Sequence, residues 1–242
     1  LLEPHASNFR RDDLFVELAK AYNQNFQPEK ALQLLLSHVF VACEGGEHAI
    51  ADQYMYAWFQ LGMAKKAAGD WAGCYELLEK ALTLPKSLGS GIWNRCKYVP
   101  YQFHMAECLE HMGKKEDAQS IYRMILDIEV EFFSNMHLRE LPYYQALCAE
   151  ALGLQQKAWN IMARAKRDWS FNLDRKGNGF FSTTPFFISF AQGPAIARRA
   201  YYQYLLGLVK LYEGDRERAK ALFQESYAGN SDSLFCHYYA HL

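Results

Sequence analysis

Small and large apolar residues recur in a fixed order along this chain, with polar residues between them at helical spacing. Five segments of 18 residues align without gaps. Each has a small residue at its second position, a glycine or phenylalanine at its ninth, a small residue at its fourteenth and a large apolar residue at its last. The segments are residues 18–35, 61–78, 105–122, 145–162 and 206–223.

This order predicts a helical hairpin in each segment. A glycine at the ninth position provides the left-handed residue that ends a first helix. The small residues allow the two helices to approach closely, and the large apolar residue fills the space between neighbouring hairpins. One such hairpin cannot bury its apolar faces alone, so we expect several to stack. The first segment departs from the pattern, because Phe26 stands where the others have glycine.

The five segments resemble the tetratricopeptide repeat (TPR), a helical hairpin with small residues at two helix positions, glycine at the turn and an aromatic residue in the second helix. The resemblance covers most of residues 12–230 and implies an all-α, TPR-like solenoid of about five hairpins. We expect one domain over residues 1–242, with a capping helix in SLFCHYYAHL, residues 233–242. The expected repeats are approximately 12–43, 55–86, 99–130, 139–167 and 200–230.

The spacing of the turns predicts long loops between the repeats. Successive turn residues lie 43, 44, 40 and 61 residues apart, against about 34 in a standard TPR. The longest interval contains an aromatic insert, residues 168–197, with GNGFFSTTPFFISFAQGP at 177–194. Its proline and hydroxyl residues argue against a membrane span. Our hypothesis is that its phenylalanines fold back onto the repeats and fill part of their groove, because so apolar a segment is poorly suited to water.

A narrower resemblance rests on EGGE after the first repeat, ALTLPKSLGSG after the second and the aromatic insert before the last. In this combination the chain is similar to the C-terminal TPR tail of large bacterial proteins that begin with a carbohydrate-related β-sandwich domain of unknown function. The resemblance implies that this chain is the helical part of a longer protein.

Composition and charge narrow the expected partners. The formal net charge is -1, which gives no overall attraction to nucleic acid or to an anionic membrane. The six cysteines have no CxxC spacing and fall mostly in apolar helical patterns, as expected for reduced, buried thiols. The chain opens without a signal peptide pattern. We therefore expect a cytoplasmic protein without a cofactor.

The concave side of a TPR array is lined by first-helix residues, and the repeat pattern predicts an aromatic and acidic lining. Aromatic rings with a polar edge suit peptide recognition, and they also stack on sugars. Alternatively, some of these residues pack beneath the chain's own loops. The carboxylate clamp of TPR cochaperones is not expected, because Val16, Met63 and Phe103 occupy its positions. The predicted lining residues are Tyr56, Phe59, Phe103, His104, Glu107, Glu110, Glu140, Tyr143, Tyr144, Glu150, Tyr201 and Tyr204.

Two short motifs carry side chains with chemical potential. HMAECLEH, residues 104–111, places two histidines, Glu107 and Cys108 along one side of a helix, and all four can ligate zinc. The alternative is an ordinary first helix with polar residues in the groove, and we expect no metal site. CEGGEH, residues 43–48, could present two carboxylates and a histidine on a turn. Its acids could equally favour the start of the next helix.

Together these features predict a noncatalytic interaction scaffold. Its expected ligand is a peptide, a partner protein or the N-terminal domain of the same polypeptide, held in the aromatic and acidic groove. The alternative is an accessory domain that contributes carbohydrate contacts to an enzyme whose catalytic domain is elsewhere. No phosphate-binding loop or nucleophile motif occurs in the chain.

Overall fold

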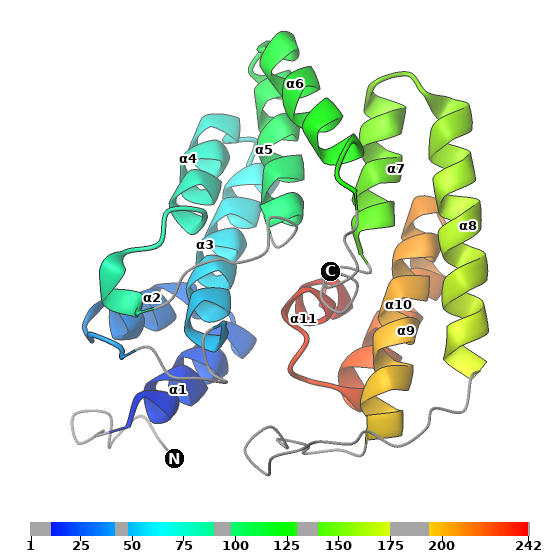
Figure 1. Cartoon of the computed structure of the whole chain (residues 1–242). Coiled ribbons are helices and arrows are strands. Elements are labelled where there is room, and N and C mark those ends of the chain that lie inside the picture. Colours follow the sequence, from blue (N-terminus) through cyan, green and yellow to red (C-terminus); the bar gives the residue numbers. More distant parts are fainter. Residues whose placement is uncertain (1–10, 42–47, 90–97, 130–139, 175–193, 242) are drawn as a thin grey trace. The chain divides into compact units, whose positions relative to one another are not determined.

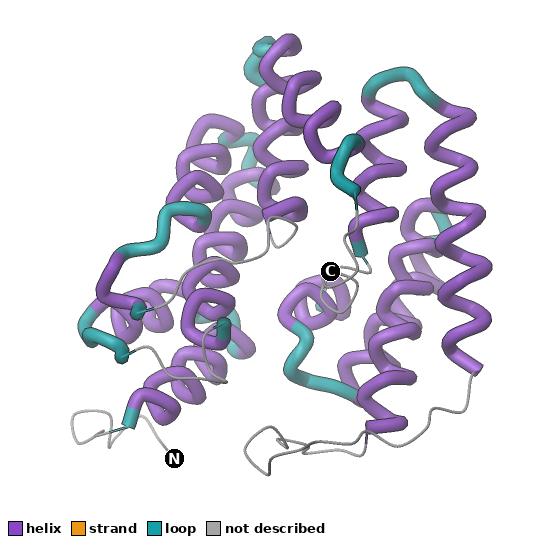
Figure 2. Tube along the Cα trace, viewed as in Figure 1, coloured by secondary structure: helices purple, strands orange, loops and turns teal. Residues whose placement is uncertain are grey.

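The computed structural model describes residues 11–41, 48–89, 98–129, 140–174 and 194–241. The chain forms two compact units, residues 1–124 and 125–242, and each is described by itself. The regular structure of the described residues is helical throughout (Figure 2). This confirms the predicted all-α fold.

Pairs of antiparallel helices follow the repeat pattern along the chain (Figure 1). A short turn joins the two helices of each pair, and a longer connection leads to the next pair. The pairs are α1 (Asp12–Gln24) with α2 (Pro28–Leu36), α3 (Ala49–Ala67) with α4 (Trp71–Ala81), α5 (Val99–His111) with α6 (Lys115–Leu126), α7 (Leu141–Ala151) with α8 (Gln155–Asp174), and α9 (Pro194–Tyr212) with α10 (Arg216–Gly229). A 3-10 turn, η2 (Lys86–Leu88), follows α4, and α11 (Leu234–Ala240) ends the chain.

The turn between the two helices of each pair is left-handed, as the glycine pattern predicts. The four turn glycines have φ between 75° and 81°, and Phe26 adopts the same region with φ 52°. A residue with a side chain is strained in this conformation. Phe26 adopts it nevertheless, so the first turn has the same left-handed shape as the four glycine turns.

Small residues bring the two helices of a pair together. Gly62 of α3 lies so close to Leu78 of α4 that an added Cβ would be 3.3 Å from the leucine side chain. The equivalent residue in the last pair, Gly207, is closer still to its partner, because a Cβ there would be 2.5 Å from the ring of Phe223. The fourteenth-position residues Ala31, Cys74 and their counterparts are fully or almost fully buried.

In the first unit, the chain that leaves α2 is fastened to the start of α1. One oxygen of Asp12 accepts a hydrogen bond from Nε2 of His38 at 2.8 Å, and the other accepts one from the backbone N–H of Val41 at 3.0 Å. The His38 ring stacks on Phe15, with 4.1 Å between centroids. These hydrogen bonds, that of Val41 first, hold the pKa of Asp12 below its ordinary value.

In the second unit, the terminal helix α11 packs on α10. Its Tyr239 ring stacks on Phe223 at 5.0 Å between centroids, and its Cys236 is completely buried. This is the capping role predicted for SLFCHYYAHL.

Three helices are longer than the repeat pattern indicates. α3 begins at Ala49, before the expected repeat start at residue 55. α8 continues to Asp174 and α9 begins at Pro194, so both extend into the stretch assigned to the aromatic insert. The phenylalanine-rich part of that insert, residues 179–190, lies outside the described residues. The hypothesis that it fills part of the groove therefore stays a prediction.

Candidate functional site

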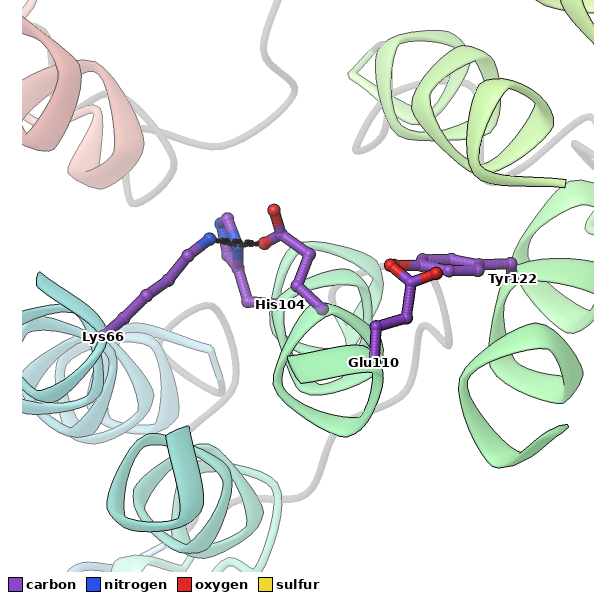
Figure 3. A network of polar contacts seen from close by, with 5 residues as sticks. Lys66, His104, Glu110 and Tyr122 are labelled. Atoms are coloured by element: carbon purple, nitrogen blue, oxygen red, sulfur yellow. Dashed lines mark hydrogen bonds and ion pairs between the residues drawn. The ribbon is translucent and has the colours of Figure 1, made fainter. Parts of the chain in front are cut away.

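Three polar side chains meet between successive first helices of the first unit. Lys66 comes from the end of α3, and His104 and Glu107 come from successive turns of α5. The Lys66 ammonium lies 2.5 Å from a Glu107 carboxylate oxygen and 3.1 Å from Nδ1 of His104. The same carboxylate oxygen lies 2.5 Å from that Nδ1. Figure 3 shows Lys66 and His104 directed toward each other from the two helices.

The short distance from Nδ1 of His104 to Glu107 fixes the proton on that nitrogen. A nitrogen and a carboxylate oxygen 2.5 Å apart need a proton between them. Burial is the main cause that lowers the pKa of His104, and the Lys66 charge acts in the same direction against the effect of Glu107. The imidazole is therefore neutral at pH 7, and its other nitrogen, Nε2, carries a lone pair.

Glu107 is the ionised member of the group. Burial by itself would raise the pKa of Glu107, but the hydrogen bond from His104 and the neighbouring positive charge outweigh it and lower the pKa to about 2. Both Lys66 and Glu107 remain half-buried, so the group borders solvent.

On the other side of α5, Glu110 is held by the second helix of the same pair. Its carboxylate accepts a hydrogen bond of 2.8 Å from the Tyr122 hydroxyl of α6. Figure 3 shows these two side chains meeting away from Lys66. The Tyr122 ring also lies 5.9 Å from the Phe103 ring, centroid to centroid. Glu110 is exposed.

A second polar group joins the first two pairs of helices. The Asn23 amide of α1 donates to the backbone oxygen of Gln53 at 3.0 Å and to its side-chain oxygen at 2.8 Å. The Gln60 amide of α3 donates to the backbone oxygen of Asn23 at 3.0 Å. We call the two groups together the polar seam, which consists of Asn23, Gln53, Gln60, Lys66, His104 and Glu107.

The repeat pattern gives the polar seam a regular register. Asn23 and Lys66 both stand three residues before the turn residue of their pair. Gln60 and His104 both stand nine residues before it. The seam thus uses the same two helix positions in successive pairs.

Most aromatic residues that the sequence places in a groove lie in the interior of their units. Phe59 packs between Tyr56, at 6.2 Å, and Tyr101, at 5.6 Å between ring centroids. Tyr204 packs against Phe223 of α10 and Tyr239 of α11, at 5.8 Å and 6.3 Å between ring centroids. The buried members of the predicted set are Tyr56, Phe59, Phe103, His104, Tyr143, Tyr144 and Tyr204.

The remaining predicted residues have some solvent exposure. In the second unit, exposed Glu150 accepts a hydrogen bond of 2.6 Å from the Tyr212 hydroxyl. Tyr201 is half-buried beside Tyr202, with 5.9 Å between ring centroids. The structure therefore gathers His104 and Glu107 in the polar seam, and places Glu150 and Tyr201 in the other unit.

The Glu140 carboxyl of the second unit lies among tyrosine hydroxyls. The residue lies directly before α7, and burial raises the pKa of its carboxyl to about 7, although a hydrogen bond with Tyr204 opposes the rise. Tyr144 and Tyr239 complete the group, and burial is the main cause that raises the pKa of both. This carboxyl is poised to change its charge near neutral pH.

The four metal-ligating side chains of HMAECLEH have other partners. Cys108 lies against Cys74 of α4, and the hydrogen bond between the thiols, with burial, raises the pKa of Cys74. The His111 ring stacks on Trp71 at 3.7 Å between centroids. No group of three or more metal-ligating side chains occurs in the part of the chain that the structure describes. In CEGGEH only His48 is described, directly before α3.

Sequence reasoning did not select Asn23, Gln60 or Lys66. The repeat alignment could have indicated Lys66, because it occupies the same repeat position as Glu110, one of the predicted lining residues. The hydrogen bonds themselves join residues 30 to 41 positions apart, so a single sequence does not reveal them.

Comparison with known proteins supports the repeat assignment at the same place. Residues 101–128 match the tetratricopeptide repeat family model. The match spans α5 and α6, and it includes His104, Glu107 and Glu110. The matched pair of helices thus contributes two of the three residues in the group of Lys66, His104 and Glu107.

Two solved structures of similar repeats were found. They are TPR-like repeats of a Podosopora anserina kinesin light chain and a glutamine-to-methionine variant of the same repeats, each 17% identical with a TM-score of 0.34. The alignment with the first structure covers 90% of this chain and 94% of the matched chain. The alignment with the variant covers 94% of this chain and 97% of the matched chain.

Among the described residues, none of the helices combines the length and the apolar character that crossing a bilayer requires.

Proposed function

We propose that this protein is a noncatalytic interaction scaffold that binds a peptide or a peptide-like segment of a partner protein along the first helices of its first unit. The observation that carries the proposal is the group of Lys66, His104 and Glu107. Helices α3 and α5 hold its donors and acceptors together at the edge of solvent. Stacked helical repeats present extended surfaces of this kind to ligands.

The chemistry of the site favours binding over catalysis. Glu107 is ionised and already paired with Lys66, and His104 donates its Nδ1 proton to the same carboxylate. A catalytic base needs an accessible group whose pKa lies near the working pH. The pKa of Glu107, at about 2, is far from that range. The TPR match over residues 101–128 also supports an interaction role.

A displayed library of random peptides tests the proposal. The whole chain is immobilised, bound peptides are enriched, and the affinity of synthetic winners is measured by fluorescence anisotropy. We expect saturable binding that the Lys66→Ala substitution weakens at least tenfold.

The matched control is Lys65→Ala, at the neighbouring position of the same helix, where the ammonium pairs with Asp70 instead. Binding to the Lys65→Ala variant should stay within about twofold of the unmodified chain. A library that yields no saturable binder, or winners that are insensitive to Lys66→Ala, would refute the proposal.

A further inference from the structure

The outer face of α8 in the second unit exposes two large aromatic side chains to solvent. Trp159 is 62% exposed and Phe171 is 69% exposed. The opposite face of the same helix, with Met162 and Trp169, is buried where α8 packs on α7 and α9. A single exposed apolar side chain is ordinary, but two exposed aromatic rings on one side of a helix indicate a contact surface.

Helical spacing places the two rings on one continuous row of side chains. Trp159, Ala163, Arg167 and Phe171 follow one another at intervals of four residues. Rows of this spacing are the ridges by which helices pack against each other. We call these four residues the α8 ridge, which is about 18 Å long at 1.5 Å of rise per residue. Its one small member, Ala163, allows a partner to approach closely between larger side chains.

Positive charge surrounds the α8 ridge. Lys157, Arg164 and Arg167 are exposed on this side of α8, together with one exposed acid, Asp168. Arg164 and Asp168 are 3.8 Å apart with side chains 80% and 57% exposed, so their mutual attraction is weak. Lys166 is already paired at 2.5 Å with a carboxylate that follows α9. Among the described residues, Lys157 and Arg167 have no ion pair, so their charges are available to a partner.

The residue types of the α8 ridge are those of protein interfaces. Tryptophan, phenylalanine and arginine are enriched at the centres of interfaces, and tryptophan and arginine are frequent among the residues that contribute most to affinity. The excess of positive charge favours a partner with carboxylates, which arginine binds through two parallel hydrogen bonds. The regular ridge favours a second helix, whose own rows of side chains fit beside it.

From these observations we infer that the α8 ridge docks an acidic, amphipathic helix of a partner protein, whose apolar side chains contact Trp159 and Phe171 and whose carboxylates pair with Arg164 and Arg167. This is a second interaction surface, in the other unit from Lys66, and it does not depend on the proposed function.

Two other anionic partners fit the α8 ridge less well. A single-stranded nucleic acid is bound in a basic groove that follows its backbone, whereas the ridge projects from the surface. An anionic bilayer presents a flat surface. Trp159 and Phe171 are about 120° apart around the helix axis at 3.6 residues per turn, so a flat surface cannot receive both rings.

A displayed library of helical peptides tests the inference on the whole chain. The library is first depleted on a Trp159→Ser, Arg167→Gln double variant and then enriched on the unmodified chain, and the affinity of synthetic winners is measured by fluorescence anisotropy. We expect winners that combine aspartate or glutamate with apolar residues at helical spacing. They should bind the Lys66→Ala variant as well as the unmodified chain, which separates this test from that of the proposed function. A library without a saturable binder, or winners without acids, would overturn the inference.

Single substitutions locate the contact. Trp159→Ser and Arg167→Gln alter exposed side chains, so the fold should be retained, which circular dichroism checks. Each should weaken binding of an acidic winner at least tenfold. Lys220→Gln, at an exposed lysine of α10, is the matched control and should leave the affinity within about twofold. Unchanged affinity in either ridge variant would show that the peptide binds elsewhere and that the inference is wrong.

The same variants decide the class of partner. Vesicles of phosphatidylserine and phosphatidylcholine, and a short single-stranded DNA, are titrated with the unmodified chain and with Arg167→Gln. We expect both to bind more weakly than the acidic winner. Tighter binding of either one that is lost in Arg167→Gln would assign the α8 ridge to a membrane or a nucleic acid instead of a protein helix.

Discussion

The Glu140 carboxyl should make the second unit less stable as the pH rises through neutrality. Burial raises the pKa of this group from 4.5 to about 7 in the folded chain. Between these two values the folded state holds a proton that the unfolded state has released, so the free energy of unfolding falls as the pH increases. Once the pH is well above 7, the penalty is complete.

The Glu140→Gln substitution removes this penalty while keeping the shape of the side chain. A shift from 4.5 to about 7 corresponds to roughly 3 kcal/mol. This is an upper limit, because the residue is half-buried and solvent screens part of the effect. We expect the glutamine variant to equal the unmodified chain near pH 4.5 and to be more stable by up to about 3 kcal/mol at pH 8.5.

Urea unfolding followed by circular dichroism, at pH values from 4.5 to 8.5, measures this difference. With a slope of about 1–3 kcal/mol per molar urea, the two midpoints should separate by up to roughly 1–3 M at the alkaline end. Glu217→Gln, an exposed carboxylate of α10, is the control and should follow the unmodified chain. A stability difference between Glu140→Gln and the unmodified chain that does not change with pH would refute the reasoning.

Four further substitutions test the packing, one turn and one helix cap of the repeats by thermal or urea unfolding. Gly207→Ala should destabilise the protein by about 1–3 kcal/mol, because the new Cβ would lie 2.5 Å from the buried Phe223 ring. Gly62→Ala, whose Cβ would lie 3.3 Å from Leu78, should destabilise it by at least about 1 kcal/mol less. Equal effects of the two substitutions would contradict the close-approach argument. Phe26→Gly should stabilise by up to about 1 kcal/mol, since it relieves the left-handed strain at φ 52°, and a loss of stability would show that the ring contributes more than the strain costs. Asp70→Ala should cost about 0.5–2 kcal/mol, because the Asp70 carboxylate caps α4; an unchanged midpoint would show that this cap is dispensable.

The helical hairpins could be predicted from the sequence because their determinants are local. Glycine at a left-handed turn and small residues at the close approach act within one pair of helices, and the structure has both. Even Phe26 follows the pattern, since the neighbouring helices impose the turn. Helix ends were less predictable: α8 runs on to Asp174 without a glycine or proline to stop it earlier.

The candidate site was only partly predictable for the opposite reason. Repeat register shows which face of a first helix a residue occupies, and it selected His104 and Glu107, which lie on successive turns of α5. It does not show how far the next pair of helices covers that face. Phe59 is therefore buried against Tyr101 of α5, whereas Lys66, seven residues later, reaches the polar seam.

The fastening of Val41 to Asp12 has a consequence for local opening. Val41 is 72% exposed, yet its backbone N–H is held by a carboxylate that lies 29 residues away in α1. Its amide can exchange with solvent only when the connection after α2 detaches from the start of α1. In a hydrogen-exchange experiment this surface amide would therefore report the detachment of that connection from α1, and acid that protonates Asp12 would accelerate the detachment.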